Sequence, residues 1–173
     1  MSYLTKAEIL RLLELLDEEL AVTGIKGELY RVGGAVMCLV LDAREATRDI
    51  DAFFKPTELI RTAAKRVAAR ADVPDTWLND AVKGYLSPRG DFGPFLDLPH
   101  LRVYAAEPHY LLAMKCAAMR LGEEFHDLDD VRYLLRYLNI ESADEALEVV
   151  TRYFDEKQLH PKTRLALEEL LDK

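Results

Sequence analysis

The first part of the chain has the apolar spacing of an amphipathic helix. Apolar residues recur every three or four positions over residues 9–20, as on one face of an α-helix. Thr5 and Glu8 precede this stretch at the spacing of a capping box, and Gly24 follows it. The pattern therefore predicts a capped helix that begins after Thr5 and ends near Gly24.

Short apolar runs bounded by charged residues, glycine or proline follow this helix. The runs at 28–32, 50–54 and 101–105 have the length and composition of β-strands. Residues 35–41 are apolar throughout, and periodicity alone allows either a strand or a buried helix; their Ala, Met and Leu content favours the helix. Residues 84–99 repeat Gly, Pro and Asp, and they predict a loop with little structure of its own.

Helical spacing accounts for the chain after Pro108. The whole pattern predicts an α+β fold, with a small mixed sheet flanked by helices in residues 1–107 and a C-terminal helical bundle in residues 108–173. The helices expected in the second part cover 110–121, 127–138, a segment opened by the Ser142 cap, and 161–173.

Composition narrows the classes of function. The 173 residues include 23 Lys and Arg against 31 Asp and Glu, a formal net charge of -8. Such a charge argues against a general affinity for nucleic acid, although it leaves room for a local basic groove. The two cysteines, Cys38 and Cys116, are expected to be buried thiols in a reducing compartment. With no signal peptide and no long apolar span, the expected location is the cytoplasm, with no membrane association.

Two carboxylates lie close together in the second predicted strand. Asp49 and Asp51 flank Ile50, and side chains two apart in a strand point to the same face. Their mutual repulsion calls for a counterion, and Mg²⁺ is commonly held by one or two carboxylates together with phosphates. The simpler alternative is a pair of solvent-facing acids on an edge strand. Acids within so apolar a run are costly unless they are paired or bind a metal, which favours the metal site.

A glycine pair separates the first predicted strand from the helix expected at 35–41. Gly33 and Gly34 would let the backbone approach a phosphate closely. The free N–H groups and positive dipole end of the following helix would face the same point, which is typical of an anion site. The alternative is that the two glycines form only a tight turn.

These two features together resemble the DNA-polymerase-beta-like nucleotidyltransferase superfamily. Its hallmark is a glycine-glycine or glycine-serine turn that opens a helix, followed by an acid-x-acid pair on the next strand. Here the chain has Gly33-Gly34 and then Thr47-Arg48-Asp49-Ile50-Asp51. Within the superfamily it is most similar to bacterial proteins related to the AbiE toxin of type IV toxin–antitoxin systems. Further stretches that support the resemblance, which covers roughly residues 25 to 140, are Trp77-Leu78-Asn79-Asp80, Tyr110-Leu111-Leu112-Ala113-Met114-Lys115 and Asp127-Leu128-Asp129-Asp130-Val131.

The resemblance implies an activity and a partner. The protein would be a Mg²⁺-dependent nucleotidyltransferase that moves a nucleotidyl group from a nucleoside triphosphate (NTP) to an RNA or protein acceptor. As the toxin of a toxin–antitoxin pair, it would be opposed by an antitoxin protein. The acidic net charge favours a small RNA footprint over a large one.

The resemblance also implies roles for single residues. Gly33 and Gly34 would bind the NTP phosphates, and Asp49 and Asp51 would bind Mg²⁺ and serve catalysis. Lys115 would reach phosphates as a point charge and share in catalysis. The later catalytic acid that accompanies this lysine would be Asp127, with Asp130 as a substitute. The alternatives are that Lys115 is a solvated helix residue and that Asp127 is the N-cap of its helix.

One departure from the family pattern keeps a second function open. Active members usually carry a third carboxylate on a later strand, and the strand predicted at 101–105 contains no acid. Asp97 and Glu107 flank that strand without occupying the expected position. The alternative is therefore a catalytically degenerate module that binds a nucleotide or a partner protein. A purely structural helical protein would require all of the matching residues to be accidental.

Overall fold

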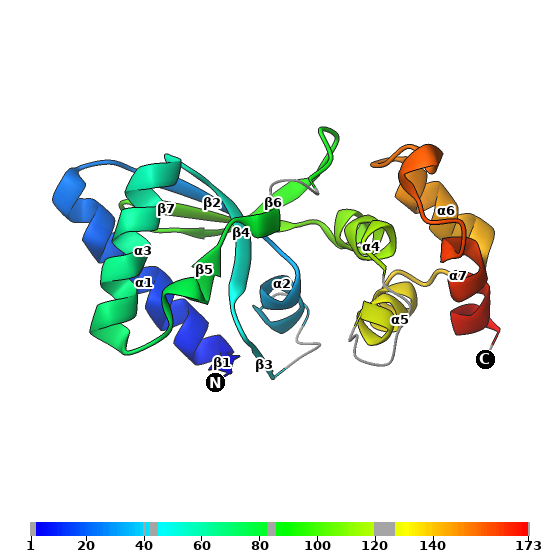
Figure 1. Cartoon of the computed structure of the whole chain (residues 1–173), viewed down its shortest axis with the longest axis horizontal. Helices are drawn as coiled ribbons and strands as arrows, with labels where there is room; N and C mark the ends of the chain where they lie inside the picture. The colour runs from blue at the N-terminus through cyan, green and yellow to red at the C-terminus, as the bar shows by residue number, and fades with distance from the viewer. Residues whose placement is uncertain (1–2, 40, 42–44, 83–85, 120–126, 173) are drawn as a thin grey trace. The chain divides into compact units, whose positions relative to one another are not determined.

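The chain forms two compact units in a computed structural model that describes residues 3–39, 41, 45–82, 86–119 and 127–172 (Figure 1). The first unit comprises Met1–Gly84 and Phe92–Ala106, and the second comprises Tyr85–Asp91 and Glu107–Lys173. The first unit holds a mixed β-sheet with helices and the second is helical, so the predicted α+β fold class is confirmed. Each unit is described by itself below.

A five-stranded sheet forms the centre of the first unit, with strand order β5-β4-β2-β7-β6. The pairs β2–β7 and β4–β5 are parallel, whereas β2–β4 and β6–β7 are antiparallel. Two further strands, β1 and β3, pair with each other. The elements are β1 (Leu4–Thr5), α1 (Lys6–Thr23), β2 (Gly27–Val32), α2 (Gly34–Leu39), β3 (Ala46–Thr47), β4 (Ile50–Lys55), α3 (Thr57–Ala71), the 3₁₀ turn η1 (Asp75–Trp77), β5 (Leu78–Asn79), β6 (Phe92–Asp97) and β7 (Leu101–Ala106).

Helix α1 begins and ends where its sequence signals predict. The Thr5 hydroxyl accepts a hydrogen bond from the Glu8 N–H at 3.3 Å, and the Thr5 N–H donates to Glu8 Oε2 at 2.7 Å. The helix ends at Gly24, whose φ of 69° is in the left-handed region that glycine adopts at low cost. The predicted capping box is therefore confirmed.

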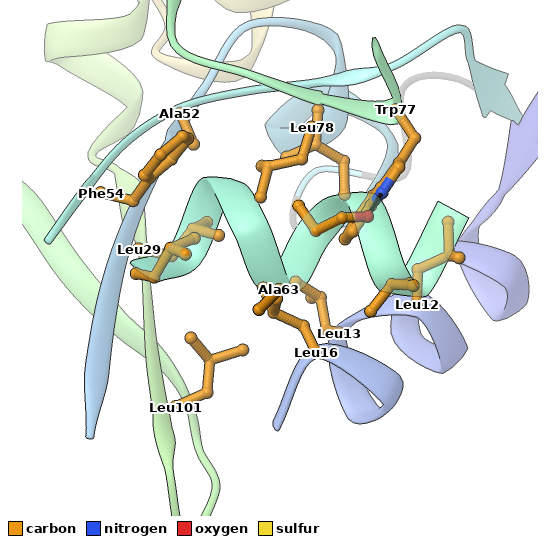
Figure 2. Close-up of a cluster of buried hydrophobic side chains, with 14 of the residues drawn as sticks. Leu12, Leu13, Leu16, Leu29, Ala52, Phe54, Ala63, Trp77, Leu78 and Leu101 are labelled. Carbon is orange, nitrogen blue, oxygen red and sulfur yellow. Dashed lines mark hydrogen bonds between the residues drawn. The ribbon is translucent and has the colours of Figure 1, made fainter. Parts of the chain in front are cut away.

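The hydrophobic core lies between one face of the sheet and helices α1 and α3 (Figure 2). Leu13 and Leu16 of α1 are fully buried with Leu29 of β2 and Leu101 of β7. This packing follows from the i, i+3 spacing of α1 and from the alternation of side chains along each strand. The polar residues of the candidate site therefore lie on the opposite face of the sheet or at the ends of its strands.

The loop predicted over residues 84–99 is wrong in its second half, because β6 runs through it. This strand lies at the edge of the sheet and contains Pro94, with a bulge between Pro94 and Leu96. An edge strand tolerates proline and a bulge, since one of its sides has no ladder hydrogen bonds to lose. Its composition therefore resembles that of a loop, and only the pairing with β7 makes it a strand.

The second unit consists of four α-helices and a 3₁₀ turn in its described part, as expected for the C-terminal bundle. The segment before β6 belongs to this unit: the Ser87 N–H donates to the Tyr110 hydroxyl at 3.0 Å, and the Tyr153 hydroxyl donates to Asp91 Oδ2 at 2.9 Å. No described helix of either unit has both the length and the apolar character needed to cross a bilayer. The helical elements are α4 (Pro108–Ala117), α5 (Asp127–Tyr137), α6 (Ala143–Thr151), η3 (Glu156–Gln158) and α7 (Thr163–Leu171).

Candidate functional site

The turn after β2 brings a glycine against a carboxylate. Gly33 has a φ of 70°, a conformation that residues with a side chain rarely adopt. A Cβ atom on Gly33 would lie 3.1 Å from Asp51 Oδ2. The Gly33 carbonyl accepts hydrogen bonds from the Val36 and Met37 N–H groups, at 3.1 and 3.3 Å, and so opens helix α2. Both the backbone angle and the neighbouring carboxylate therefore require glycine at this position.

The predicted carboxylate pair lies at the start of β4. Asp51 is the second residue of this strand and pairs with Val32 on β2 and with Asn79 on β5. Asp49 directly precedes the strand, and its Oδ2 accepts a hydrogen bond from Asn79 Nδ2 at 3.2 Å. The antiparallel β2–β4 pair thus brings the glycine turn and the two acids together, although 14 residues separate Gly34 from Asp49.

Partial burial and the negative charge of Asp51 both act on the Asp49 carboxyl. Burial raises the pKa of the half-buried Asp49 carboxyl, and the negative charge of Asp51 raises it further. The charge of Arg48 and the hydrogen bond from Asn79 act in the opposite direction, but they do not cancel the rise. A divalent cation between the carboxylates would remove the repulsion and favour both charged forms.

The donor set of this pair suits Mg²⁺. Carboxylate oxygens are the hard ligands that Mg²⁺ prefers, and one or two of them suffice when water and phosphate oxygens complete the shell. Among the described residues, no group of three or more His, Cys, Asp or Glu side chains could form a complete protein cage for a metal.

Asp97 and Glu107, the two acids that flank β7, each interact with a neighbouring residue. Asp97 forms an ion pair with Lys26 at 2.9 Å and lies 3.5 Å from Arg102, on the edge strand β6. Glu107, in the second unit, caps helix α4 by accepting from the His109 N–H at 2.9 Å and also contacts the His109 ring. Both acids therefore have structural partners, and β7 itself contains no acid.

The second unit pairs the predicted lysine with an acid. Lys115 of α4 forms an ion pair of 2.9 Å with Asp130 of α5, and the two side chains are 15% and 5% exposed. The acid in contact with Lys115 is thus the one expected only as a substitute. Helix α5 begins at Asp127, as predicted, but the side chain of Asp127 lies outside the described residues, so its role stays a prediction.

Two polar residues of the sheet were not singled out by their sequence: Asn79 beside the acid pair, and Arg31 on the opposite, core-facing side of β2. Asn79 is a polar partner of Asp49, and only the parallel pairing of β5 with β4 places it there. Arg31 of β2 is fully buried, and its guanidinium has no hydrogen-bond partner in the described structure. Its Cζ atom lies 4.1 Å from the centre of the Phe95 ring, and burial lowers its pKa to about 10. The sequence signal for this buried charge was an arginine within an apolar run, which is unusual because arginine is rarely buried.

The functional assignment depends on this chain's own residues, because comparison with known proteins gives no match. No protein-family model, no curated protein and no solved structure matches the chain. The resemblance to nucleotidyltransferases therefore rests on the motifs of the sequence and on the geometry described above.

Proposed function

We propose that the protein is a Mg²⁺-dependent nucleotidyltransferase that moves a nucleotidyl group from an NTP to a hydroxyl of an RNA or protein acceptor. The observation that carries this proposal is the contact between the Gly33 turn and Asp51, with Asp49 beside it. A close-approach glycine turn and a repelling acid pair occur together where phosphates and a cation are to be bound. The resemblance to AbiE-related toxins supports the reaction class and an antitoxin protein as partner.

The candidate site residues of the first unit would each have a role in this reaction. Asp49 and Asp51 would hold Mg²⁺, which when bound stabilises the charge that develops on the phosphate oxygens. The absence of side chains at Gly33 and Gly34 leaves the backbone N–H groups accessible to phosphate oxygens. Asn79 fixes the Asp49 carboxylate through its amide hydrogen bond and thereby acts as a positioning residue.

The transfer itself exchanges one phosphorus–oxygen bond for another. The acceptor oxygen forms a bond to the α-phosphorus, and the bond from that phosphorus to the bridging oxygen breaks. Pyrophosphate leaves with the electron pair of the broken bond, and the proton of the acceptor hydroxyl passes to solvent or to a carboxylate. In the second unit, the Lys115–Asp130 pair is proposed to supply a positive charge for phosphates, with Asp130 orienting the ammonium group.

A second candidate function is a nucleotide-binding or protein-interaction module without catalysis. The observation that favours it is the lack of an acid in β7, together with the structural engagement of Asp97 and Glu107. Such a module would retain metal-dependent nucleotide binding at Asp49 and Asp51 but would not release pyrophosphate.

The two functions are distinguished by turnover of labelled NTPs. Each of the four NTPs is incubated with Mg²⁺ and a cell extract, and pyrophosphate release and transfer of label are both measured. The Asp49→Asn, Asp51→Asn double variant tests the site, and Glu14→Gln is the matched control because it removes an exposed carboxylate of α1 in the same unit. Transfer that is lost only in the double variant supports the transferase. Metal-dependent binding without pyrophosphate release supports the degenerate module, and no binding overturns both.

A further inference from the structure

Three aromatic residues form a continuous row across the centre of the sheet. Phe53 of β4, Tyr30 of β2 and Tyr104 of β7 are direct partners in the strand register. The Tyr30 and Tyr104 rings are stacked with centroids 4.7 Å apart and an 8° angle between their planes, and the Phe53 ring is tilted at 5.7 Å from Tyr30. All three side chains are only half-buried. Because Tyr30 stacks on Tyr104 and packs against Phe53, the ring face that a base could take is the one that Tyr104 turns away from Tyr30, toward β6. RNA-binding sheets use aromatic residues on their surface to stack unpaired bases.

This row shares its face with the candidate metal site. Phe53 follows Asp51 by two positions in β4, so both side chains project from the same side of the sheet. The opposite side is the one that packs on α1 and α3, where Phe54 and Leu29 are buried (Figure 2). The first ring of the row therefore lies about 7 Å along the strand from Asp51.

A pocket of about 270 Å³ lies at the other end of the row, between β6 and β7. Tyr104 lines it together with Pro94, its direct partner on β6. Arg102 and Asp97, which are also direct partners, line it as well and offer a donor and an acceptor. A planar ring in this pocket would extend the stacked row beyond Tyr104 and would meet polar groups that can bind the edge of a base.

Positive charge accompanies the row at both ends. The Lys55 ammonium lies 5.4 Å from the centre of the Phe53 ring and 5.8 Å from that of Tyr30. Lys55 is exposed and has no ion pair in the described structure. At the far end, the Arg102 side chain is 52% exposed. Lys55 and Arg102 lie in one cross-strand row with Glu28 between them, and Arg102 lies 3.5 Å from Asp97. The positive charge beside the row therefore suffices for contact with one or two phosphates.

The row is also held rigidly. The Tyr30 hydroxyl donates a hydrogen bond of 2.7 Å to Glu28 Oε2, which fixes the ring and raises its pKa to about 12. The Phe92 ring packs against Tyr30 edge to face, with centroids 5.3 Å apart. A platform that is ordered in advance loses little conformational entropy when a base stacks on it.

We propose that the surface formed by Phe53, Tyr30, Tyr104 and the pocket beside Tyr104 binds the unpaired nucleotides of an RNA acceptor. The inference rests on the proposed function, since it assigns the acceptor class of that site. The binding is local, so the net negative charge of the chain is compatible with it. A contact with only one or two phosphates predicts a shallow dependence of affinity on salt.

The test measures RNA binding without catalysis. A fluorescently labelled, short single-stranded oligoribonucleotide is titrated with the protein in EDTA, and its anisotropy is recorded. Tyr104→Leu retains apolar volume but removes the stacking face, and we expect it to weaken binding about tenfold. Tyr104→Phe retains the ring and is expected to bind like the wild type. Tyr137→Leu, at an exposed tyrosine of α5, is the matched control. Thermal unfolding of each variant verifies that it is folded.

The outcomes separate this inference from the proposed function. Full RNA binding by folded Tyr104→Leu, or no binding by the wild type, overturns the inference even where pyrophosphate is released normally. Competition by free NTPs in EDTA as effective as that by the unlabelled oligonucleotide also overturns it, because the site then takes a mononucleotide. RNA binding that persists in the Asp49→Asn, Asp51→Asn double variant supports it. Loss of turnover in that double variant, with RNA binding intact, separates the transferase site from the stacking surface.

Discussion

Gly33 and Asp51 lie so close together that one methyl group on the glycine would stand 3.1 Å from the carboxylate oxygen. Gly33 lies in the turn directly after β2 and Asp51 lies in β4, and their contact depends on the antiparallel pairing of these strands. It joins the turn expected to bind phosphate to the acid expected to bind Mg²⁺. The contact thus gives a structural reason for a glycine next to an acid-x-acid pair, and it can be tested by substitution.

Gly33→Ala is expected to reduce both stability and metal-dependent NTP binding. The left-handed backbone angle costs about 1–2 kcal/mol for a residue with a side chain, and the new methyl group displaces the Asp51 carboxylate. Gly24→Ala is the matched control, because Gly24 has almost the same φ of 69° but no atom within 4 Å of the added methyl group. Thermal unfolding should show losses of similar size in both variants, whereas calorimetric titration with NTP and Mg²⁺ should show a loss only for Gly33→Ala. Unchanged NTP binding by Gly33→Ala would refute the proposed phosphate site.

Asp49→Asn is expected to stabilise the protein at neutral pH in the absence of divalent cations. The folded-state pKa of Asp49 is raised by burial and by Asp51, so the folded protein binds the proton more tightly than the unfolded chain does. Stability from this group is therefore present below the unfolded pKa of about 4 and is lost as pH rises through the raised folded value. The amide removes the charge and still accepts from Asn79. We expect the melting temperature to rise at pH 7 and the gain to vanish below about pH 4.

Asp97→Asn, in the same unit, is expected to change stability at neutral pH in the opposite direction to Asp49→Asn. Its hydrogen bond with Lys26 lowers the pKa of Asp97, so its charged form contributes stability at neutral pH that is lost in acid. The variant should melt slightly below the wild type at pH 7 and coincide with it at low pH. Melting curves of Asp49→Asn and Asp97→Asn over a pH series test both predicted directions of the stability change. A stability loss at pH 7 for Asp49→Asn would contradict the unfavourable effect of burial and of Asp51 on the charged form of Asp49.

Local signals in the sequence were sufficient for most of the fold, and pairing decided the rest. The capping box at Thr5 and the apolar runs of β2, β4 and β7 depend only on neighbouring residues, so they could be predicted. Strand β6 could not, because its proline and bulge are acceptable only at the edge of a sheet.

Part of the candidate site could be predicted from local signals in the sequence, and the rest depends on strand pairing. The acid-x-acid pair and the glycine turn are visible in the sequence, but Asn79 joins them only through the pairing of β5 with β4. The contact of Asp130 with Lys115 depends on the rotation of α5 about its axis, which short-range spacing does not determine. The catalytic roles of these residues stay predictions.

Arg31→Met is expected to leave stability unchanged or to raise it. The buried guanidinium has lost its hydration and gains only the Phe95 ring in return, and its lowered pKa reflects that cost. Replacement of a buried charged group by an apolar side chain of similar length is often neutral or stabilising by 1–4 kcal/mol, which corresponds to a rise of roughly 2–8 °C here. Chemical denaturation measures the free energy of unfolding. A large loss of stability in Arg31→Met would show that the guanidinium has an anionic partner in solution.

The Lys115–Asp130 pair predicts a non-additive pair of substitutions. Because both side chains are largely buried, removal of either charge alone leaves the other without its partner in a poorly hydrated place. Lys115→Met and Asp130→Asn should each lower the free energy of unfolding by about 2–3 kcal/mol, whereas Lys115→Met, Asp130→Leu should recover most of the loss. The exposed pair Arg164–Asp144 is the control, and Arg164→Met should change stability by less than about 0.5 kcal/mol. If the recovered double variant also retained NTP turnover, Lys115 would have a structural role only; loss of turnover in a stable double variant supports its proposed contact with phosphate.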